Sequence, residues 1–268
     1  RPRLHGVVGA LVYRLIRITE RTGAHLASAV VTVDETLGTI YRRANRRVII
    51  IGHYPNRALA AEPSLAFTRA DLTLLYVGRL SADRGSLVYA EVLRRLREQG
   101  IPARLRLAGV FTPANEEQHF RERCQGLEDA VEFIGWVHYG QIATLLRSAD
   151  VGLAILQPEP RYVAALPVKL FEYMAAGLPV VASNFPPIAA VWREAQFGAL
   201  VDPTDPQAAV AQIRYWWEHP DEARAAGEKG RQAILRKYNW EAVIQQLDEL
   251  YGSLFSHSRP FRNAHPLP

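Results

Sequence analysis

The sequence contains little cysteine and methionine, and it has no long apolar run. Cys124 is the only cysteine among the 268 residues, so an intramolecular disulfide is excluded and a reducing compartment fits. Polar residues interrupt every apolar stretch before it reaches the roughly 18 residues that a membrane-spanning helix needs. The only methionine is Met174 and the chain starts at Arg1. We therefore expect either that the chain was processed or that it is a fragment of a longer one.

Several familiar motifs are also absent. The sequence contains neither GxxxxGK[ST] nor GxGxxG, which argues against a P-loop NTPase and a standard dinucleotide site. It contains no GxSxG nucleophile elbow, and its histidines show no metal-ligand spacing. We expect no metal and no cofactor.

Positive charge is concentrated at the front of the chain. Residues 1–57 hold ten arginines and three acidic residues, a net charge of +7 in a chain whose total is +5. Apolar and basic residues alternate there with helical period, Leu11, Leu15 and Ile18 on one face and Arg14, Arg17 and Arg21 on another. This helix either lies at an anionic membrane surface or packs its apolar face on protein with the arginines in water. Nucleic acid is not favoured, because no aromatic residues interleave with the arginines.

From Leu72 to Phe255 the sequence alternates between strand and helix patterns. Apolar, β-branched runs predict strands at 72–77, 103–108, 131–134, 151–156, 179–182 and 199–201. Helices are predicted between the first five of these strands, and three more after Pro206. Such alternation predicts an α/β fold, a doubly wound parallel sheet that binds ligands at the carboxyl ends of its strands. Before it, residues 1–56 show only a helix, strand, helix, strand series, and the run 48–52 is typical of a buried strand.

Two segments at strand ends are candidates for ligand binding. Gly78–Gly85 lies where a strand ends and a helix begins, so its backbone amides and Arg79 and Arg84 could hold a diphosphate. It could equally be a turn with two solvated arginines. In Lys169–Ser183, Lys169 and Glu172 share a helix face, and Glu172 could accept the hydroxyls of a ribose. The alternative for this pair is a surface salt bridge.

Together these segments resemble the carboxyl-terminal half of GT-B glycosyltransferases of the GT4 type. The resemblance covers roughly residues 48–255 and is specific as a set, although each motif is weak alone. It is carried by Gly78-Arg79 with Arg84-Gly85, by Val131–Val137, by Ser148–Leu153, by Glu172–Ser183, by Phe197–Val201 and by Tyr238–Glu241.

The resemblance implies a domain plan. Residues 1–56 would be the remnant of an amino-terminal acceptor domain, truncated and Rossmann-like, and 57–71 a linker. Residues 72–239 would form the domain that binds the nucleotide-sugar donor, and 240–255 a helix that crosses back. The tail 256–268 is expected to be disordered.

The resemblance also implies a reaction and its residues. The reaction is a retaining transfer of a sugar from a nucleotide-sugar, such as a UDP- or GDP-sugar, to a glycan or lipid-linked acceptor in the cytoplasm, at the inner face of the membrane. Arg79 and Arg84 would be catalytic, because they would stabilise the negative charge that grows on the leaving diphosphate. The other donor-binding residues would be Gly78, Gly135, Trp136, Val137, Leu166, Lys169 and Glu172. Trp136 could instead fill the core.

One position departs from the family pattern. The family has a second glutamate eight residues before the position of Glu172, and Ala164 stands there. Ala165, Leu166 and Pro167 replace the loop that approaches the donor sugar, and Lys169 could compensate with a phosphate or sugar contact. The departure leaves two rivals open: a donor-binding module without transferase activity, and another GT-B enzyme such as a nucleotide-sugar epimerase. The fragment alone is expected to be inactive.

Overall fold

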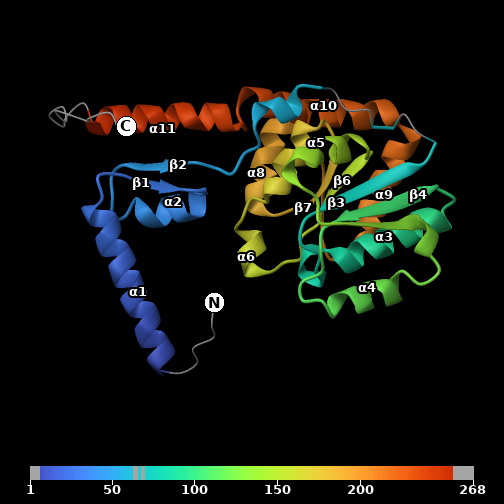
Figure 1. Ribbon diagram of the computed structural model, residues 1–268, viewed down its shortest axis with the longest axis horizontal. Helices are drawn as coiled ribbons and strands as arrows, with labels where there is room; N and C mark the ends of the chain where they lie inside the picture. The colour runs from blue at the N-terminus through green and yellow to red at the C-terminus, as the bar shows by residue number, and fades with distance from the viewer. Residues whose placement is uncertain (1–6, 63–65, 68–69, 256–268) are drawn as a thin grey trace, which may run out of the picture. The chain divides into compact units, whose positions relative to one another are not determined.

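The computed structural model describes residues 7–62, 66–67 and 70–255 (Figure 1). The chain forms two compact units, one from the residues up to His53 and from Ala242 onward, the other from Tyr54 to Glu241. The expected disordered tail, 256–268, lies outside the described residues.

The larger unit is built on a parallel sheet of six strands. The strands are β3 (Leu72–Val77), β4 (Ala103–Ala108), β5 (Val131–Gly135), β6 (Val151–Ala154), β7 (Val180–Ser183) and β8 (Gly198–Val201). Their order across the sheet is β5-β4-β3-β6-β7-β8, and every pair is parallel. The expected α/β class and doubly wound parallel sheet are confirmed.

Helices cover both faces of this sheet, as Figure 1 shows. One core cluster packs residues of α5 (Tyr139–Arg147), α7 (Val168–Ala175), α8 (Pro186–Ala195) and α10 (Pro220–Arg236) against the sheet. The other packs α3 (Ser86–Glu98), α4 (Glu116–Arg123) and α9 (Pro206–Glu218). Cys124, at the end of α4, is buried, and burial raises the pKa of its thiol to about 11, so it is a packing residue. Two cores separated by one sheet are what strands apolar on both faces require.

Strand order places the ligand edge between β3 and β6. The chain winds outward from β3 through β4 and β5, then returns to β6 and winds the other way. At such a reversal the loops after the two central strands diverge and leave a crevice. The strands themselves part early, because β3 is in register with β6 only at Leu74 and Leu75.

The smaller unit contains α1 (Val7–Leu26), β1 (Val30–Thr32), α2 (Glu35–Tyr41), β2 (Val48–Ile50) and most of α11 (Trp240–Phe255). Strands β1 and β2 are parallel. The strand predicted at 48–52 is present and parallel, but the β2 residues are only partly buried, so the expected burial was wrong. Leu11, Leu15 and Ile18 are exposed. No helix among the described residues is long and apolar enough to span a bilayer.

The segment expected to be a linker, 57–71, lies within the larger unit. It contains a 3₁₀ helix, Arg57–Ala60, and the side chains of Ala60 and Ala66 are fully buried in the core. The buried carboxylate of Asp150 accepts the Phe67 N–H at 2.6 Å and the Thr73 N–H at 2.7 Å. Much of this proline-bearing segment is therefore part of the packed unit.

Two helices were not anticipated from the sequence. These are α6 (Pro160–Val163) and α8 (Pro186–Ala195), and each begins at a proline. Proline disrupts a helix interior but suits the first turn, because the N–H that it lacks would have no partner there. Their prolines therefore mark starting points, which the sequence pattern did not distinguish from loops.

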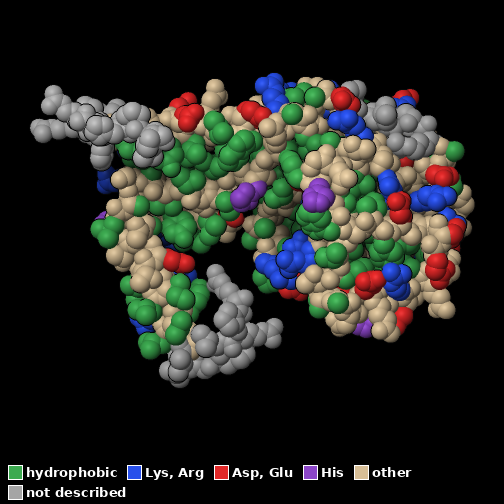
Figure 2. Space-filling view, in the orientation of Figure 1, with side chains coloured by type: hydrophobic (Ala, Val, Ile, Leu, Met, Phe, Trp, Pro, Cys, Tyr) green, Lys and Arg blue, Asp and Glu red, His purple; other side chains and the backbone are tan. Residues whose placement is uncertain are grey.

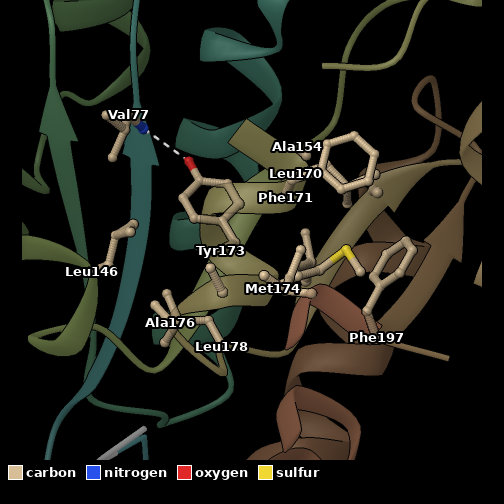
Figure 3. Packing of buried hydrophobic residues seen from close by; sticks show 14 of the residues in the cluster. Val77, Leu146, Ala154, Leu170, Phe171, Tyr173, Met174, Ala176, Leu178 and Phe197 are labelled. Atoms are coloured by element: carbon tan, nitrogen blue, oxygen red, sulfur yellow. Dashed lines mark hydrogen bonds between the residues drawn. The ribbon is translucent and has the colours of Figure 1, made fainter. Parts of the chain in front are cut away.

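Where β3 and β6 part, a tyrosine hydroxyl replaces the missing strand partner. The Tyr173 hydroxyl accepts the Val77 N–H at 2.9 Å, and the Tyr173 side chain is fully buried (Figure 3). Its ring fits because Gly152 on β6 has no side chain, and a Cβ there would lie 2.6 Å from the ring.

Tyr173→Phe should therefore destabilise the fold. The substitution leaves a buried N–H without an acceptor, so we expect the free energy of unfolding to fall by about 1–3 kcal/mol. Urea denaturation measures this loss. Tyr139→Phe, at an exposed tyrosine on α5, is the control and should change stability by less than about 0.5 kcal/mol. Equal effects of the two substitutions would contradict the role given to the Tyr173 hydroxyl.

Candidate functional site

The loop after β3 begins at a glycine that the site requires. Gly78 has φ +129°, a conformation that side chains disfavour, and a Cβ there would lie 2.0 Å from Cε of Lys169 and 2.3 Å from its Nζ. The Lys169 side chain, from α7, therefore rests directly on the Gly78 backbone. Two of the predicted site segments meet at this contact.

The second glycine of the loop fixes where Arg84 lies. Gly85 ends a short 3₁₀ helix, Ala82–Arg84, and starts α3 with φ +88°. A Cβ at Gly85 would lie 2.1 Å from the Ile155 carbonyl oxygen, so the loop after β3 packs closely on the chain leaving β6. The buried Tyr89 hydroxyl donates to the Arg84 carbonyl at 2.8 Å.

The two arginines of the loop have different environments. Arg79 is exposed, whereas Arg84 is partly buried and its buried Nε has no hydrogen-bond partner among the described residues. Burial opposes the charge of Arg84, but Tyr76, Tyr162 and Asp83 outweigh it and raise the pKa of the guanidinium. Arg84 is therefore a permanent cation with a donor left over, and not a solvated side chain. Arg79 fits either of the two expectations.

Lys169 and Glu172 do not form the salt bridge that was one of the alternatives. Neither side chain has an ion pair within 4.0 Å or a hydrogen bond to any residue that the structure describes, although both are partly buried. Burial lowers the pKa of Lys169 and the positive charge of Arg84 lowers it further, with Glu172 opposing. Burial raises the pKa of Glu172, with Lys169 opposing. Two charged groups thus share a poorly solvated space.

The turn after β5 lies further along the sheet. Gly135 has φ +75°, and Trp136 is 68% exposed, with its ring 4.4 Å from the His138 ring. Trp136 is therefore not core filler, whereas Val137 packs against a core cluster. No hydrogen bond, ion pair or ring contact joins this turn to Arg84, Lys169 or Glu172 in the described part of the chain, so its place in the donor site stays a prediction.

The loop after β6 carries the departure from the family pattern. Ala164 is exposed, and Leu166 is partly buried against the core. The predicted donor contact of Leu166 stays a prediction.

Sequence reasoning missed a group of side chains between the loops. The Asp83 carboxylate accepts from the Ser81 hydroxyl, pairs with Arg161 and accepts from the Tyr162 hydroxyl at 3.3 Å. Burial would raise the pKa of Asp83, but these donors lower it. Figure 2 shows basic side chains gathered over α6, which carries Arg161 and Tyr162. Only the position of Asp83 beside Arg84 could have suggested this group.

A large surface cleft lies elsewhere. It has a volume of about 840 Å³ and is lined by side chains of α3, α4 and the turn after α4, among them Leu87, Arg94 and His119. It shares no residue with the Arg84–Lys169–Glu172 group. This cleft lies on the outer surface of two helices and is lined by both acidic and basic side chains. We therefore take the loops at the sheet edge, and not this cleft, as the candidate site.

The chain belongs to the glycosyl transferases group 1 family, which matches residues 60–233. The match spans the sheet, the loop with Arg84 and the helix with Lys169 and Glu172. The resemblance drawn from the sequence is thereby confirmed.

Known proteins resemble this chain in sequence or in fold. The phosphatidyl-myo-inositol mannosyltransferase of Mycobacterium leprae is 30% identical over 200 residues, which cover 74% of this chain and 51% of that protein. The GDP-mannose:cellobiosyl-diphosphopolyprenol alpha-mannosyltransferase of Xanthomonas oryzae pv. oryzae is 26% identical over 184 residues, 68% of this chain and 47% of that protein. The crystal structure of Anabaena Alr3699/HepE in complex with UDP has a TM-score of 0.75 at 17% identity, covering 94% of this chain and 70% of that one. The chain spans about half the length of the curated relatives that it matches.

The electrostatics of Lys169 can be measured without a ligand. We expect its amine to titrate below the ordinary value of about 10.4, because burial and Arg84 disfavour the protonated form. Glu172→Gln should lower the pKa of Lys169 further, because it removes the negative charge that opposes this shift. NMR of the lysine side chains measures both midpoints, and Lys169→Arg assigns the signal. A midpoint that Glu172→Gln leaves in place would contradict the described proximity.

Proposed function

We propose that this chain is the donor-binding part of a retaining glycosyltransferase, which transfers a sugar from a nucleotide-sugar to an acceptor. The observation that carries the proposal is the juxtaposition of Arg84, Lys169 and Glu172 at the carboxyl edge of β3 and β6, without ion pairs among themselves or to the described residues. Family membership supports it.

The chemistry follows from the charges. When the bond from the anomeric carbon to the phosphate oxygen breaks, negative charge grows on the leaving diphosphate. The partly buried Arg84 and Lys169 are the cations that would stabilise it, with Arg79 at the exposed side of the loop. Donors fixed before the reaction need no reorganisation as the charge develops. The Glu172 carboxylate would accept the ribose hydroxyls, and the Gly135–Val137 turn would border the base. No metal is required in this scheme.

The acceptor is proposed to be a glycan or a lipid-linked sugar. The names of two relatives include a lipid-linked molecule, phosphatidyl-myo-inositol in one and a cellobiosyl-diphosphopolyprenol in the other. The exposed apolar residues of α1, together with its arginines, would suit the cytoplasmic face of a membrane. We propose that the donor carries UDP or GDP.

The rival functions make different predictions about turnover. Ala164 in place of the family glutamate favours a module that binds donor without transferring it. A panel of UDP- and GDP-sugars would show binding without product if that rival holds. Consumption of the donor in the absence of acceptor would point to an epimerase. The fragment is proposed to have no transferase activity alone.

Arg84→Ala should weaken the binding of UDP or GDP about tenfold or more, because a charge-assisted hydrogen bond contributes roughly 1.5–3 kcal/mol. Binding of the nucleoside should change little, since it has no phosphate. Calorimetric titration of the 268-residue chain measures both. Arg214→Ala, at an exposed arginine on α9, is the matched control. Equal losses for the diphosphate and the nucleoside would exclude Arg84 as a phosphate ligand.

Glu172→Ala should remove recognition of the ribose. We expect the unsubstituted chain to bind UDP more tightly than 2′,3′-dideoxy-UDP, because the missing hydroxyls leave the carboxylate without donors. In the Glu172→Ala variant the two ligands should bind about equally. Glu159→Ala, at an exposed glutamate of the neighbouring loop, should keep the preference. A preference that survives in Glu172→Ala would rule out the ribose contact.

A further inference from the structure

We propose that Tyr162, held by Asp83, is a positioning residue that orients the Arg84 guanidinium toward the diphosphate. The inference rests on the proposed function, because it takes Arg84 to be a phosphate ligand. It adds a residue of the loop after β6 that no family motif in this sequence includes.

Tyr162, on the loop after β6, contacts two residues of the loop after β3, Asp83 and Arg84. Tyr162 is 9% exposed as a residue, and its hydroxyl donates to Asp83 Oδ2 at 3.3 Å. The Cζ atom of Arg84 lies 5.3 Å from the centroid of the Tyr162 ring and the Cζ atom of Arg161 lies 4.7 Å from it, both within the range of a cation–π contact. The backbone is tied as well, because the Gln157 N–H donates to the Asp83 carbonyl at 2.9 Å. The ring is therefore fixed relative to the loop that carries Arg84.

A ring suits this task because it attracts a guanidinium without using its N–H groups. A carboxylate would orient Arg84 equally well, but it would neutralise the charge and occupy the donors that a phosphate needs. Asp83 does not do this, since its oxygens already accept from Ser81, Arg161 and Tyr162. The buried Nε of Arg84 is left without a partner among the described residues. Arg84 is thus oriented and still available to an anion.

The loop after β6 differs from the family pattern in what it contacts. In the resembled family a glutamate at the position of Ala164 approaches the donor sugar from this loop. Here Ala164 has no such group, and the loop instead contacts the phosphate segment through Tyr162, two residues earlier. The loop after β6 would then act on the diphosphate through Arg84.

The test is a double-mutant cycle between Tyr162 and Arg84, read by titration of UDP and uridine into the full chain. Tyr162→Leu keeps apolar volume but removes the ring, and we expect it to weaken UDP binding about tenfold, in line with a partly desolvated cation–π contact. Uridine binding should stay unchanged. In the Arg84→Ala background Tyr162→Leu should have no further effect on UDP, because the residue acts through Arg84. Tyr162→Phe keeps the ring but loses the hydrogen bond to Asp83, so it should weaken UDP binding less than Tyr162→Leu does.

Tyr13→Leu is the matched control, since Tyr13 also lies under an arginine, Arg17, at 6.0 Å, but on α1. It should leave the binding of UDP unchanged. Should Tyr162→Leu fail to fold, NMR of the unsubstituted chain is the second measurement. The ring current of Tyr162 should move the Arg84 Nε–H resonance away from the usual arginine position, and added UDP should shift it again.

The outcomes separate the two claims. If Arg84→Ala leaves UDP binding intact, or if the unsubstituted chain binds neither UDP nor GDP, the proposed function fails and takes this inference with it. If Arg84→Ala weakens UDP binding but Tyr162→Leu does not, only the positioning role is overturned. Equal losses of UDP and uridine in Tyr162→Leu, or additive losses in the double variant, would also overturn it. An Arg84 Nε–H resonance that lies at the usual arginine position and does not shift with UDP would overturn the positioning role as well.

Discussion

The early parting of β3 and β6 is the constraint on which the site depends. Their register ends at Leu75, two residues before β3 itself ends, so the last backbone N–H of β3 must find another acceptor. The Tyr173 hydroxyl supplies it, and Gly152 makes room for the ring. Because Tyr173 lies on α7 next to Glu172, the bond that repairs the sheet also fixes the helix that carries Lys169 and Glu172. Fold and site are coupled through one side chain.

The positive charges of Arg84 and Lys169 lie where β3 and β6 separate, and neither forms an ion pair with the described residues. Lys169 reaches over Gly78, and burial lowers the pKa of its amine, with a smaller contribution in the same direction from the positive charge of Arg84. The positive charges of Arg84 and Lys169 repel each other, and partial burial makes this repulsion stronger than it would be in water. An arrangement of this kind persists only because the surrounding packing holds it. Under the proposed function, the diphosphate of the donor would supply the negative charge that relieves this repulsion.

The sequence predicted the parts of the structure that depend on local patterns. Buried strands with apolar residues on both faces are visible as runs, and the order of strands and helices is enough to imply a doubly wound sheet. Glycines at Gly78 and Gly85 were recognisable as a turn, and Lys169 and Glu172 as neighbours on a helix. The segment 57–71 could not be predicted, because proline and small residues are compatible with a linker and with the packed backbone around Ala60 and Ala66. Helices that begin at proline were missed for a similar reason.

The contacts around Asp83 could not be predicted because they join loops from two strands. Asp83 and Tyr162 are separated by 79 positions, and no local pattern relates them. Their approach depends on β3 and β6 being neighbours at the point where the chain reverses direction across the sheet. A residue that acts through a second residue leaves little trace in a motif, since another side chain on either loop can perform the same task. Ala164, where the family glutamate is absent, and Tyr162 lie two positions apart on the same loop. In this chain that loop contacts Arg84 through the tyrosine ring, so the positioning role inferred for Tyr162 assigns the loop to the phosphate side of the site.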